Sequence, residues 1–324
     1  MMVVAVAHET IVSLQLTAVE LIGHKLMLTE DLLNNPAQIL SLAQRQFYLD
    51  NGFLCLPKLL DMQAVADLRA TTAALIDSSR SVKESNESFD LGSTHNEKVP
   101  DVRRIRAVVD RHPLYWQVAS NSIITDVAAD LVGPDVKFHS AKLNVKRAGG
   151  GDVIKWHQDI QGWPHTNYSP VTIGIYLEDV DLQQGPLQAI PKSHNGPLHE
   201  QYAGTRWTGY IADDDLNDID IESAVPMAGA AGTAVIVNCR TIHGSAPNLT
   251  QRDRPLLLFV YSAADAFSYT APPTPTSHTG EIVRGQTARW AHHDPRPCPI
   301  PPDWAKTGYG SIFSAQTGED NAQR

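Results

Sequence analysis

Short β-type runs separated by turn residues fill the second half of the chain, and they restrict the fold more than any other feature. Residues 171–177, 233–237 and 256–261 are rich in β-branched and large apolar side chains, and residues 186–190 form a shorter run. Turn formers such as Pro247-Asn248 lie between these runs. Many short strands with regular turns are typical of an antiparallel barrel or jelly roll.

Amphipathic helices are predicted ahead of these strands. Apolar side chains have helical spacing from residue 36 to Asn51-Gly52, where the glycine predicts a helix end. A second helix is expected at residues 61–76 with Asp61 as its N-cap, and a third at residues 123–131. Helices that precede a β-rich half predict a covering layer, so we expect a mainly β protein with flanking helices.

The two ends of the chain are weakly patterned. Residues 1–36 finish in the turn signal Asn34-Asn35-Pro36, and we interpret them as a variable segment ahead of one domain at residues 37–324. The polar residues 78–100 predict a long loop. Two proline-rich stretches after residue 270 predict a tail that wraps the barrel as irregular structure.

The charge balance and the cysteines exclude several classes of function. Lysine and arginine number 26 against 36 aspartate and glutamate, a net charge of −10, which disfavours nucleic acid or an anionic membrane as a partner. No apolar run approaches the length of a membrane span. Three widely spaced cysteines suggest neither a disulfide framework nor a zinc ribbon and indicate a reducing, cytoplasmic location. The oligomeric state stays open, a homodimer included.

A row of polar residues marks the strand predicted from Val136. Phe138, Ser140, Lys142, Asn144 and Lys146 alternate along it and are expected on one side of the strand. Burying such a row is costly unless it faces a polar pocket. We therefore expect this strand to line a pocket, with Ser140 as a candidate substrate contact.

An imidazole and a carboxylate lie two residues apart in another predicted strand. Residues i and i+2 of a strand point to one face, so His157 and Asp159 can offer a nitrogen and an oxygen to one metal ion. His243, just after the β-rich run 233–237, is the best candidate for a third ligand. Two histidines and one aspartate leave about three positions of an octahedral ion open, the facial arrangement of non-haem Fe(II) oxygenases.

A guanidinium is expected close to this metal site. Arg254 follows His243 by eleven residues, with the turn formers Pro247-Asn248 between them. A hairpin of this length can return Arg254 to the interior, where its planar fork would bind a carboxylate through two hydrogen bonds. Ser245, on the same side as His243, would add a hydroxyl.

Four motifs in order resemble the phytanoyl-CoA dioxygenase superfamily of Fe(II)/2-oxoglutarate-dependent oxygenases. They span roughly residues 42 to 304, and they are Tyr48-Leu49-Asp50-Asn51-Gly52-Phe53, Trp156-His157-Gln158-Asp159, Gly185-Pro186-Leu187-Gln188-Ala189-Ile190-Pro191-Lys192-Ser193-His194 and His243-Gly244-Ser245. The resemblance implies a double-stranded β-helix, the cupin-like jelly roll.

The resemblance also implies roles for single residues. His157, Asp159 and His243 would bind Fe(II), and Arg254 would bind the far carboxylate of 2-oxoglutarate beside Ser245. A further co-substrate contact would come from Lys146, or from Asn144 if the strand register slips, and Trp163 would contact the substrate. The sequence around Ile160–Pro164 departs from the ectoine hydroxylase pattern, which disfavours ectoine as the substrate.

We therefore expect a hydroxylase that acts on a small organic molecule, such as a specialised metabolite, while 2-oxoglutarate and O₂ are converted to succinate and CO₂. Asp159 occupies the position that radical halogenases leave vacant, so oxygen insertion is favoured over halogenation. Desaturation, ring closure and endoperoxide formation by the same cofactor chemistry remain alternatives, as does a jelly-roll binding module without activity.

Overall fold

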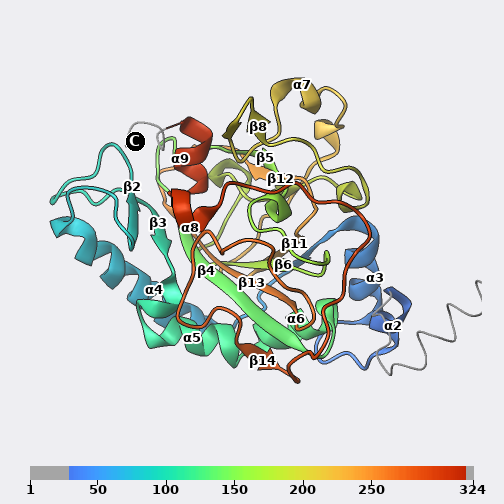
Figure 1. The fold of residues 1–324 in the computed structure, drawn as a ribbon. Helices are drawn as coiled ribbons and strands as arrows, with labels where there is room; N and C mark the ends of the chain where they lie inside the picture. The colour runs from blue at the N-terminus through green and yellow to red at the C-terminus, as the bar shows by residue number, and fades with distance from the viewer. Residues whose placement is uncertain (1–28, 319–324) are drawn as a thin grey trace, which may run out of the picture.

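Two antiparallel sheets form the body of the computed structural model, which describes residues 29–318 (Figure 1). The larger sheet has the strand order β1-β11-β6-β13-β4-β3-β2, with β14 also paired to β4, and the smaller has the order β10-β7-β12-β5. Side chains of both sheets line one cavity, so the sheets face each other. This is the jelly-roll arrangement that the strand pattern predicts.

The strands of the two sheets are β1 (Phe53–Leu56), β2 (Phe89–Leu91), β3 (Val102–Arg106), β4 (Val136–Lys146), β5 (Ile154–His157), β6 (Val171–Tyr176), β7 (Gln188–Ala189), β10 (Val225–Pro226), β11 (Ala234–Asn238), β12 (His243–Ser245), β13 (Arg254–Ala263) and β14 (Ile282–Arg284). A separate hairpin pairs β8 (Tyr202–Ala203) with β9 (Arg206–Trp207). The helices are α2 (Thr29–Asn34), α3 (Leu42–Asn51), α4 (Met62–Ser78), α5 (Pro113–Ser120), α6 (Ile123–Val132), α7 (Asp213–Leu216), α8 (Trp304–Thr307) and α9 (Ile312–Thr317).

The main apolar core lies between the larger sheet and the helices α3 to α6. Ala141, Leu143 and Val145 of β4 are buried there together with Leu68 of α4 and Val127 of α6. The alternate residues of β4 face the opposite side and line the cavity. The helices thus form the covering layer that the sequence predicts, and the other face of the larger sheet is left for the site.

A bulge in β4 corrects one detail of the predicted polar row. Phe138 pairs with Tyr261, but Ser140 pairs with the adjacent Val260, so His139 is an extra residue on β4. One inserted residue reverses the alternation of side chains. Phe138 therefore belongs to the apolar core, whereas Ser140, Lys142 and Asn144 line the cavity.

The predicted helix boundaries hold where capping chemistry determines them. Gly52 ends α3 in a left-handed conformation with φ of 80°, which glycine adopts at no steric cost. Asp61 accepts a hydrogen bond from the backbone of Ala64 at 2.8 Å and caps α4. The predicted loop 78–100 is wrong in part, because it contains β2, which pairs with β3.

The C-terminal segment crosses the front of the barrel in Figure 1 and is not wholly irregular, because it contains β14, α8 and α9. The predicted variable segment 1–36 lies mostly outside the described residues, and its last part contains α2. Between residues 29 and 318, the helices all fall short of the length and apolar character that a bilayer crossing requires.

Candidate active site

Three candidate ligands converge at the edge of the smaller sheet. His243 of β12 is paired directly with His157 of β5, and Asp159 follows β5 at the start of a short 3₁₀ helix. The Nε2 atoms of His157 and His243 lie 3.7 Å and 3.9 Å from Oδ1 of Asp159. One ligand atom from each residue lies within 4.8 Å of the others, and no second group of this kind occurs in residues 29–318.

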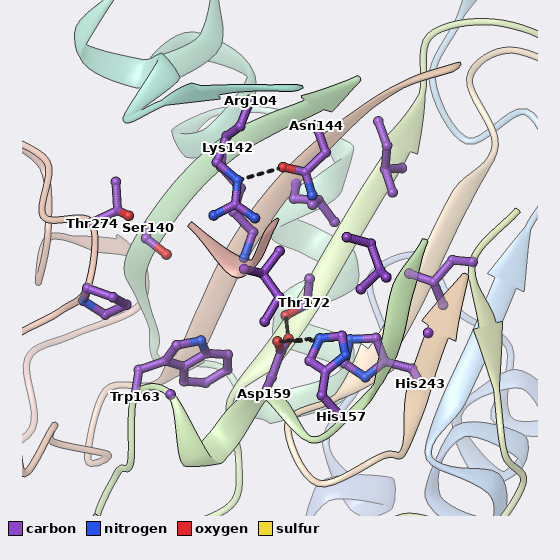
Figure 2. Close-up of a pocket in the computed structure, with 18 of the residues that line it drawn as sticks. Arg104, Ser140, Lys142, Asn144, His157, Asp159, Trp163, Thr172, His243 and Thr274 are labelled. Carbon is purple, nitrogen blue, oxygen red and sulfur yellow. Dashed lines mark hydrogen bonds and ion pairs between the residues drawn. The ribbon is translucent and has the colours of Figure 1, made fainter. Parts of the chain in front are cut away.

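Backbone carbonyls fix the orientation of both imidazoles. Nδ1 of His157 lies 2.8 Å from the carbonyl oxygen of Lys155, and Nδ1 of His243 lies 2.9 Å from that of Thr241. Each Nδ1–H therefore donates to a carbonyl, and the lone pair on Nε2 faces Asp159. Thr172 of β6 donates to Oδ2 of Asp159 at 2.8 Å, which leaves Oδ1 directed at the histidines (Figure 2).

Electrostatics keep this ligand set in the protonation state that a metal requires. Burial and the neighbouring His243 lower the pKa of His157 to about 3, so its ring is neutral at physiological pH. Burial raises the pKa of Asp159, but His243, Lys142 and His157 together lower it to about 2. Two histidines and one carboxylate suit Fe(II) and leave positions for other ligands.

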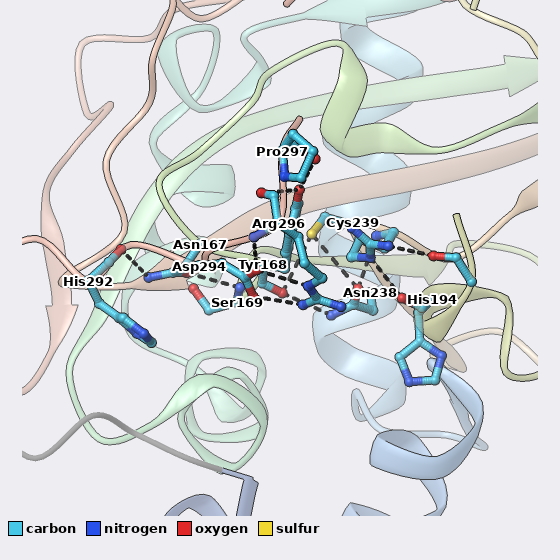
Figure 3. A network of polar contacts seen from close by, with 12 residues as sticks. Asn167, Tyr168, Ser169, His194, Asn238, Cys239, His292, Asp294, Arg296 and Pro297 are labelled. Atoms are coloured by element: carbon cyan, nitrogen blue, oxygen red, sulfur yellow. Dashed lines mark hydrogen bonds and ion pairs between the residues drawn. The ribbon is translucent and has the colours of Figure 1, made fainter. Parts of the chain in front are cut away.

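A polar network behind the site holds the turn that delivers His243 (Figure 3). Arg240 donates through Nε to the carbonyl of His194 at 2.8 Å, and its guanidinium lies 4.4 Å from the ring centre of Tyr168. Arg296 of the C-terminal segment lies 4.8 Å from the same ring. His194 itself contacts the carbonyl of Leu49 at 2.9 Å, so the structure places it in this scaffold and away from the metal ligands.

The candidate ligands border a cavity of about 90 Å³ between the sheets. Its lining includes Arg254, Ser245, Asn144, Ser140 and Trp163, five of the six other predicted site residues. The acidic and basic side chains in its wall are Asp159, Arg104, Lys142 and Arg254. The predicted hairpin between His243 and Arg254 is wrong, because β12 pairs with β5 and β7 in the smaller sheet whereas β13 pairs with β4 and β6 in the larger one. The connection between them crosses from one sheet to the other and still brings Arg254 to the cavity that His243 lines.

Arg254 carries an unsatisfied guanidinium into this cavity. Its side chain is only 2% exposed, and Nε and Nη1 have no hydrogen-bond partner among the described residues. Burial lowers its pKa, with the ring of Tyr176 5.8 Å away. A buried cation without a counter-charge is costly, so this position is built for an anionic ligand such as a carboxylate.

Lys146 and Asn144 of β4 were the two alternatives for a contact with the co-substrate, and they lie in different surroundings. Lys146 is 1% exposed, does not line the cavity, and donates through Nζ to the carbonyl oxygens of Ser245 and Ala246. Asn144 lines the cavity and accepts a hydrogen bond from Nε of Arg104 at 2.8 Å. Lys146 therefore supports β12 from behind, and of the two residues only Asn144 lines the cavity.

Trp163 and Ser140 lie on the side of the cavity away from Arg254. Trp163 is buried and packs on His139, with ring centres 5.3 Å apart. Ser140 contacts His139 through its hydroxyl at 3.0 Å. Both line the cavity (Figure 2), and their contact with a substrate stays a prediction.

Several lining residues were not singled out from the sequence. Lys142 belonged to the polar row but received no role, and Arg104 gave no signal because β3 had not been recognised as a neighbour of β4. The roof was also missed, and it consists of Trp207 from the β8–β9 hairpin with Tyr309 and Ile312 from the C-terminal segment. Edge-to-face contacts among Trp207, Trp304 and Tyr309 hold this roof together.

Comparison with known proteins accounts for this arrangement. The model of the phytanoyl-CoA dioxygenase (PhyH) family matches residues 48–256, a span that contains the three candidate ligands and Arg254. The chain belongs to the phytanoyl-CoA dioxygenase family. It is an Fe(II)/2-oxoglutarate-dependent dioxygenase, as the sequence predicts, with iron and 2-oxoglutarate as cofactor and co-substrate.

Relatives within this class differ in substrate. The chain is 26% identical over 281 residues to a "Probable alpha-ketoglutarate-dependent hypophosphite dioxygenase" of Stutzerimonas stutzeri, covering 84% of this chain and 96% of that protein. EctD from S. alaskensis, solved with 2-oxoglutarate and 5-hydroxyectoine, matches with a TM-score of 0.59 at 21% identity over 72% of this chain and 80% of EctD. The carbocyclase SnoK from nogalamycin biosynthesis matches with a TM-score of 0.59 at 21% identity over 78% of this chain and 98% of SnoK. The last two likenesses confirm the double-stranded β-helix fold.

Proposed function

We propose that this dioxygenase hydroxylates a small organic molecule while 2-oxoglutarate and O₂ are converted to succinate and CO₂. The observation that carries the proposal is the buried, unpartnered guanidinium of Arg254 in the same cavity as His157, Asp159 and His243. A metal-binding set alone fits many proteins, whereas an arginine that requires an anion beside it fits a dicarboxylic co-substrate.

In this proposal, separate side chains bind the iron, the co-substrate and the substrate. Nε2 of His157, Oδ1 of Asp159 and Nε2 of His243 hold the iron, and Arg254 with Ser245 holds the far carboxylate of 2-oxoglutarate. When bound, iron would react 2-oxoglutarate with O₂, and this chemistry would supply the oxidising power that replaces a C–H hydrogen by a hydroxyl group. Trp163 and Ser140 border the space for the substrate, and the roof over the cavity excludes water.

The size of the cavity favours a small substrate over an acyl-CoA thioester. It measures about 90 Å³, and helix α9 packs beside β5 over it. An acidic protein with a net charge of −10 also repels a polyanionic CoA group at long range. We further propose a cytoplasmic protein, for which the three free cysteines are suited, without nucleic acid or membrane as a partner.

Anaerobic titration with Fe(II) and 2-oxoglutarate tests the proposal. The wild-type protein is expected to develop a weak visible charge-transfer band and, in air, to release succinate. His157→Ala is expected to lose both, because the iron loses one of its three protein ligands. Absence of the band in the native protein would count against the proposal.

Ring closure remains a second candidate outcome, because the carbocyclase SnoK shares this fold. Mass analysis of the product separates the two, since hydroxylation adds one oxygen atom and ring closure by loss of two hydrogens adds none.

A further inference from the structure

The cavity holds more positive charge than the cofactors neutralise. Of the ionic side chains in its wall, Arg104, Lys142 and Arg254 are cations and Asp159 is the single anion. Fe(II), doubly anionic 2-oxoglutarate, Asp159 and Arg254 together carry no net charge. Arg104, which is buried, and Lys142, which is half-buried, are left over, and cations removed from water are costly unless an anion pairs with them.

Neither of these two cations is neutralised by a described side chain. The ammonium of Lys142 has no hydrogen bond or ion pair within residues 29–318. Arg104 is 1% exposed and donates through Nε to Asn144, but its Nη2 has no partner among the described residues. The bond to Asn144 holds the guanidinium in one orientation without supplying a negative charge.

The strand register places the two cations together and apart from Arg254. Arg104 pairs with Asn144 across β3 and β4, so Lys142, two residues along β4, is its diagonal neighbour on the same face. Asn144 and its partner Leu256 of β13 lie between Arg104 and Arg254. Figure 2 shows Arg104 and Lys142 across the cavity from His157 and His243. One anion can therefore occupy this pair while another occupies Arg254.

We propose that the substrate is a small oxyacid whose anionic group, a carboxylate or a phosphorus oxyanion, is bound by Arg104 and Lys142. This inference rests on the proposed function and adds the substrate class. Lys142 lines the same cavity as His157, Asp159 and His243, so an acid held by its ammonium can direct its neighbouring atoms toward the metal ligands. The apolar side chains Leu256 and Leu258 in the same wall suit the carbon skeleton of such an acid.

A panel of short carboxylic acids and alkylphosphonates, each matched with its neutral amide or ester, tests the proposal. Substrate-dependent consumption of 2-oxoglutarate by the wild-type protein is expected with acids and not with their neutral partners. Stimulation by carboxylates alone or by phosphonates alone identifies which oxyacid is used. Equal stimulation by neutral analogues overturns the inference and leaves the dioxygenase activity established.

Variants of Lys142 separate substrate binding from co-substrate binding. Lys142→Met is expected to raise KM for the acid by about tenfold or more, because a hydrogen bond to a charged group is lost, while KM for 2-oxoglutarate stays unchanged. Lys142→Arg retains most of the affinity, and Lys83→Met, at an exposed position, has no effect. A rise confined to KM for 2-oxoglutarate would assign the pair to the co-substrate and overturn the proposal.

Direct binding covers the case in which no panel member is oxidised. Acids are added to the anaerobic protein with Fe(II) and 2-oxoglutarate, and thermal unfolding is followed. Stabilisation of wild type by an acid, lost in Lys142→Met, supports the proposal. Binding of 2-oxoglutarate without binding of any acid overturns the substrate class alone, and failure to bind 2-oxoglutarate overturns the proposed function instead.

Discussion

Replacing Arg254 by methionine should abolish tight binding of 2-oxoglutarate without weakening the fold. The guanidinium is 2% exposed and two of its nitrogens lack partners in the described structure, so its binding energy is available to the co-substrate. Truncating one side of a buried, hydrogen-bonded charge pair costs about 2 to 5 kcal/mol. This corresponds to an increase of about 30-fold to about 4000-fold in Kd.

The same substitution should leave the unliganded protein at least as stable as wild type. An apolar side chain of similar length removes a buried charge that has no counter-charge within residues 29–318, which is often neutral or stabilising. Thermal unfolding with and without 2-oxoglutarate measures this effect. Wild type should gain stability from the ligand, and Arg254→Met should not.

The matched control is Arg252→Met, two residues earlier, where the side chain is 57% exposed and pairs with Asp181. It should bind 2-oxoglutarate as wild type does. If Arg254→Met also bound 2-oxoglutarate with unchanged Kd in the anaerobic Fe(II) titration, the assignment of Arg254 to the co-substrate would be refuted.

Three further predictions concern Asp159, the pair Asn144 and Lys146, and Lys142. Asp159→Ala should lower Fe(II) affinity at least about tenfold, measured by equilibrium dialysis, because the site loses its anionic ligand; unchanged iron content would exclude Asp159 as a ligand. Asn144→Ala should raise KM for 2-oxoglutarate or the substrate, whereas Lys146→Met should mainly lower the melting temperature. A raised KM in Lys146→Met, with only a lower melting temperature in Asn144→Ala, would assign the ligand contact to Lys146 instead. Burial, helped by a neighbouring arginine, lowers the pKa of Lys142 to about 8. KM for an acidic substrate should therefore be flat below about pH 7 and rise about tenfold per unit well above pH 8 as the cation is lost, and Lys142→Arg should keep the profile flat.

The metal ligands could be predicted from the sequence because their geometry is mostly local. His157 ends β5 and Asp159 lies two residues on, just past the strand at the start of a 3₁₀ helix, so the predicted strand is too long but the two-residue spacing still brings both to the site. A turn between β11 and β12 suffices to deliver His243. Arg254 begins β13 in the other sheet, and the short connection after β12 returns it to the same cavity without forming the predicted hairpin. None of these inferences needs the order of strands in the sheet.

The remaining cavity residues depend on strand pairing that is not local. Arg104 reaches the cavity only because β3 pairs with β4 in a register that sets it opposite Asn144. Lys146 has the alternation of a cavity residue, but at its end of β4 the carbonyls of Ser245 and Ala246 are within reach of its ammonium. The extra residue His139 changes which side chains face inward. Alternation along one strand reveals neither a partner strand nor a bulge.

The part of the roof formed by Tyr309 and Ile312 affects the order in which the site is assembled during synthesis. These residues follow every strand of both sheets in the chain, so they leave the ribosome after the strands that carry the metal ligands. A nascent protein can form both sheets and bring the three metal ligands together while the cavity beside them is still exposed to water. The roof over the metal ligands is therefore added only after the strands that hold them have been made.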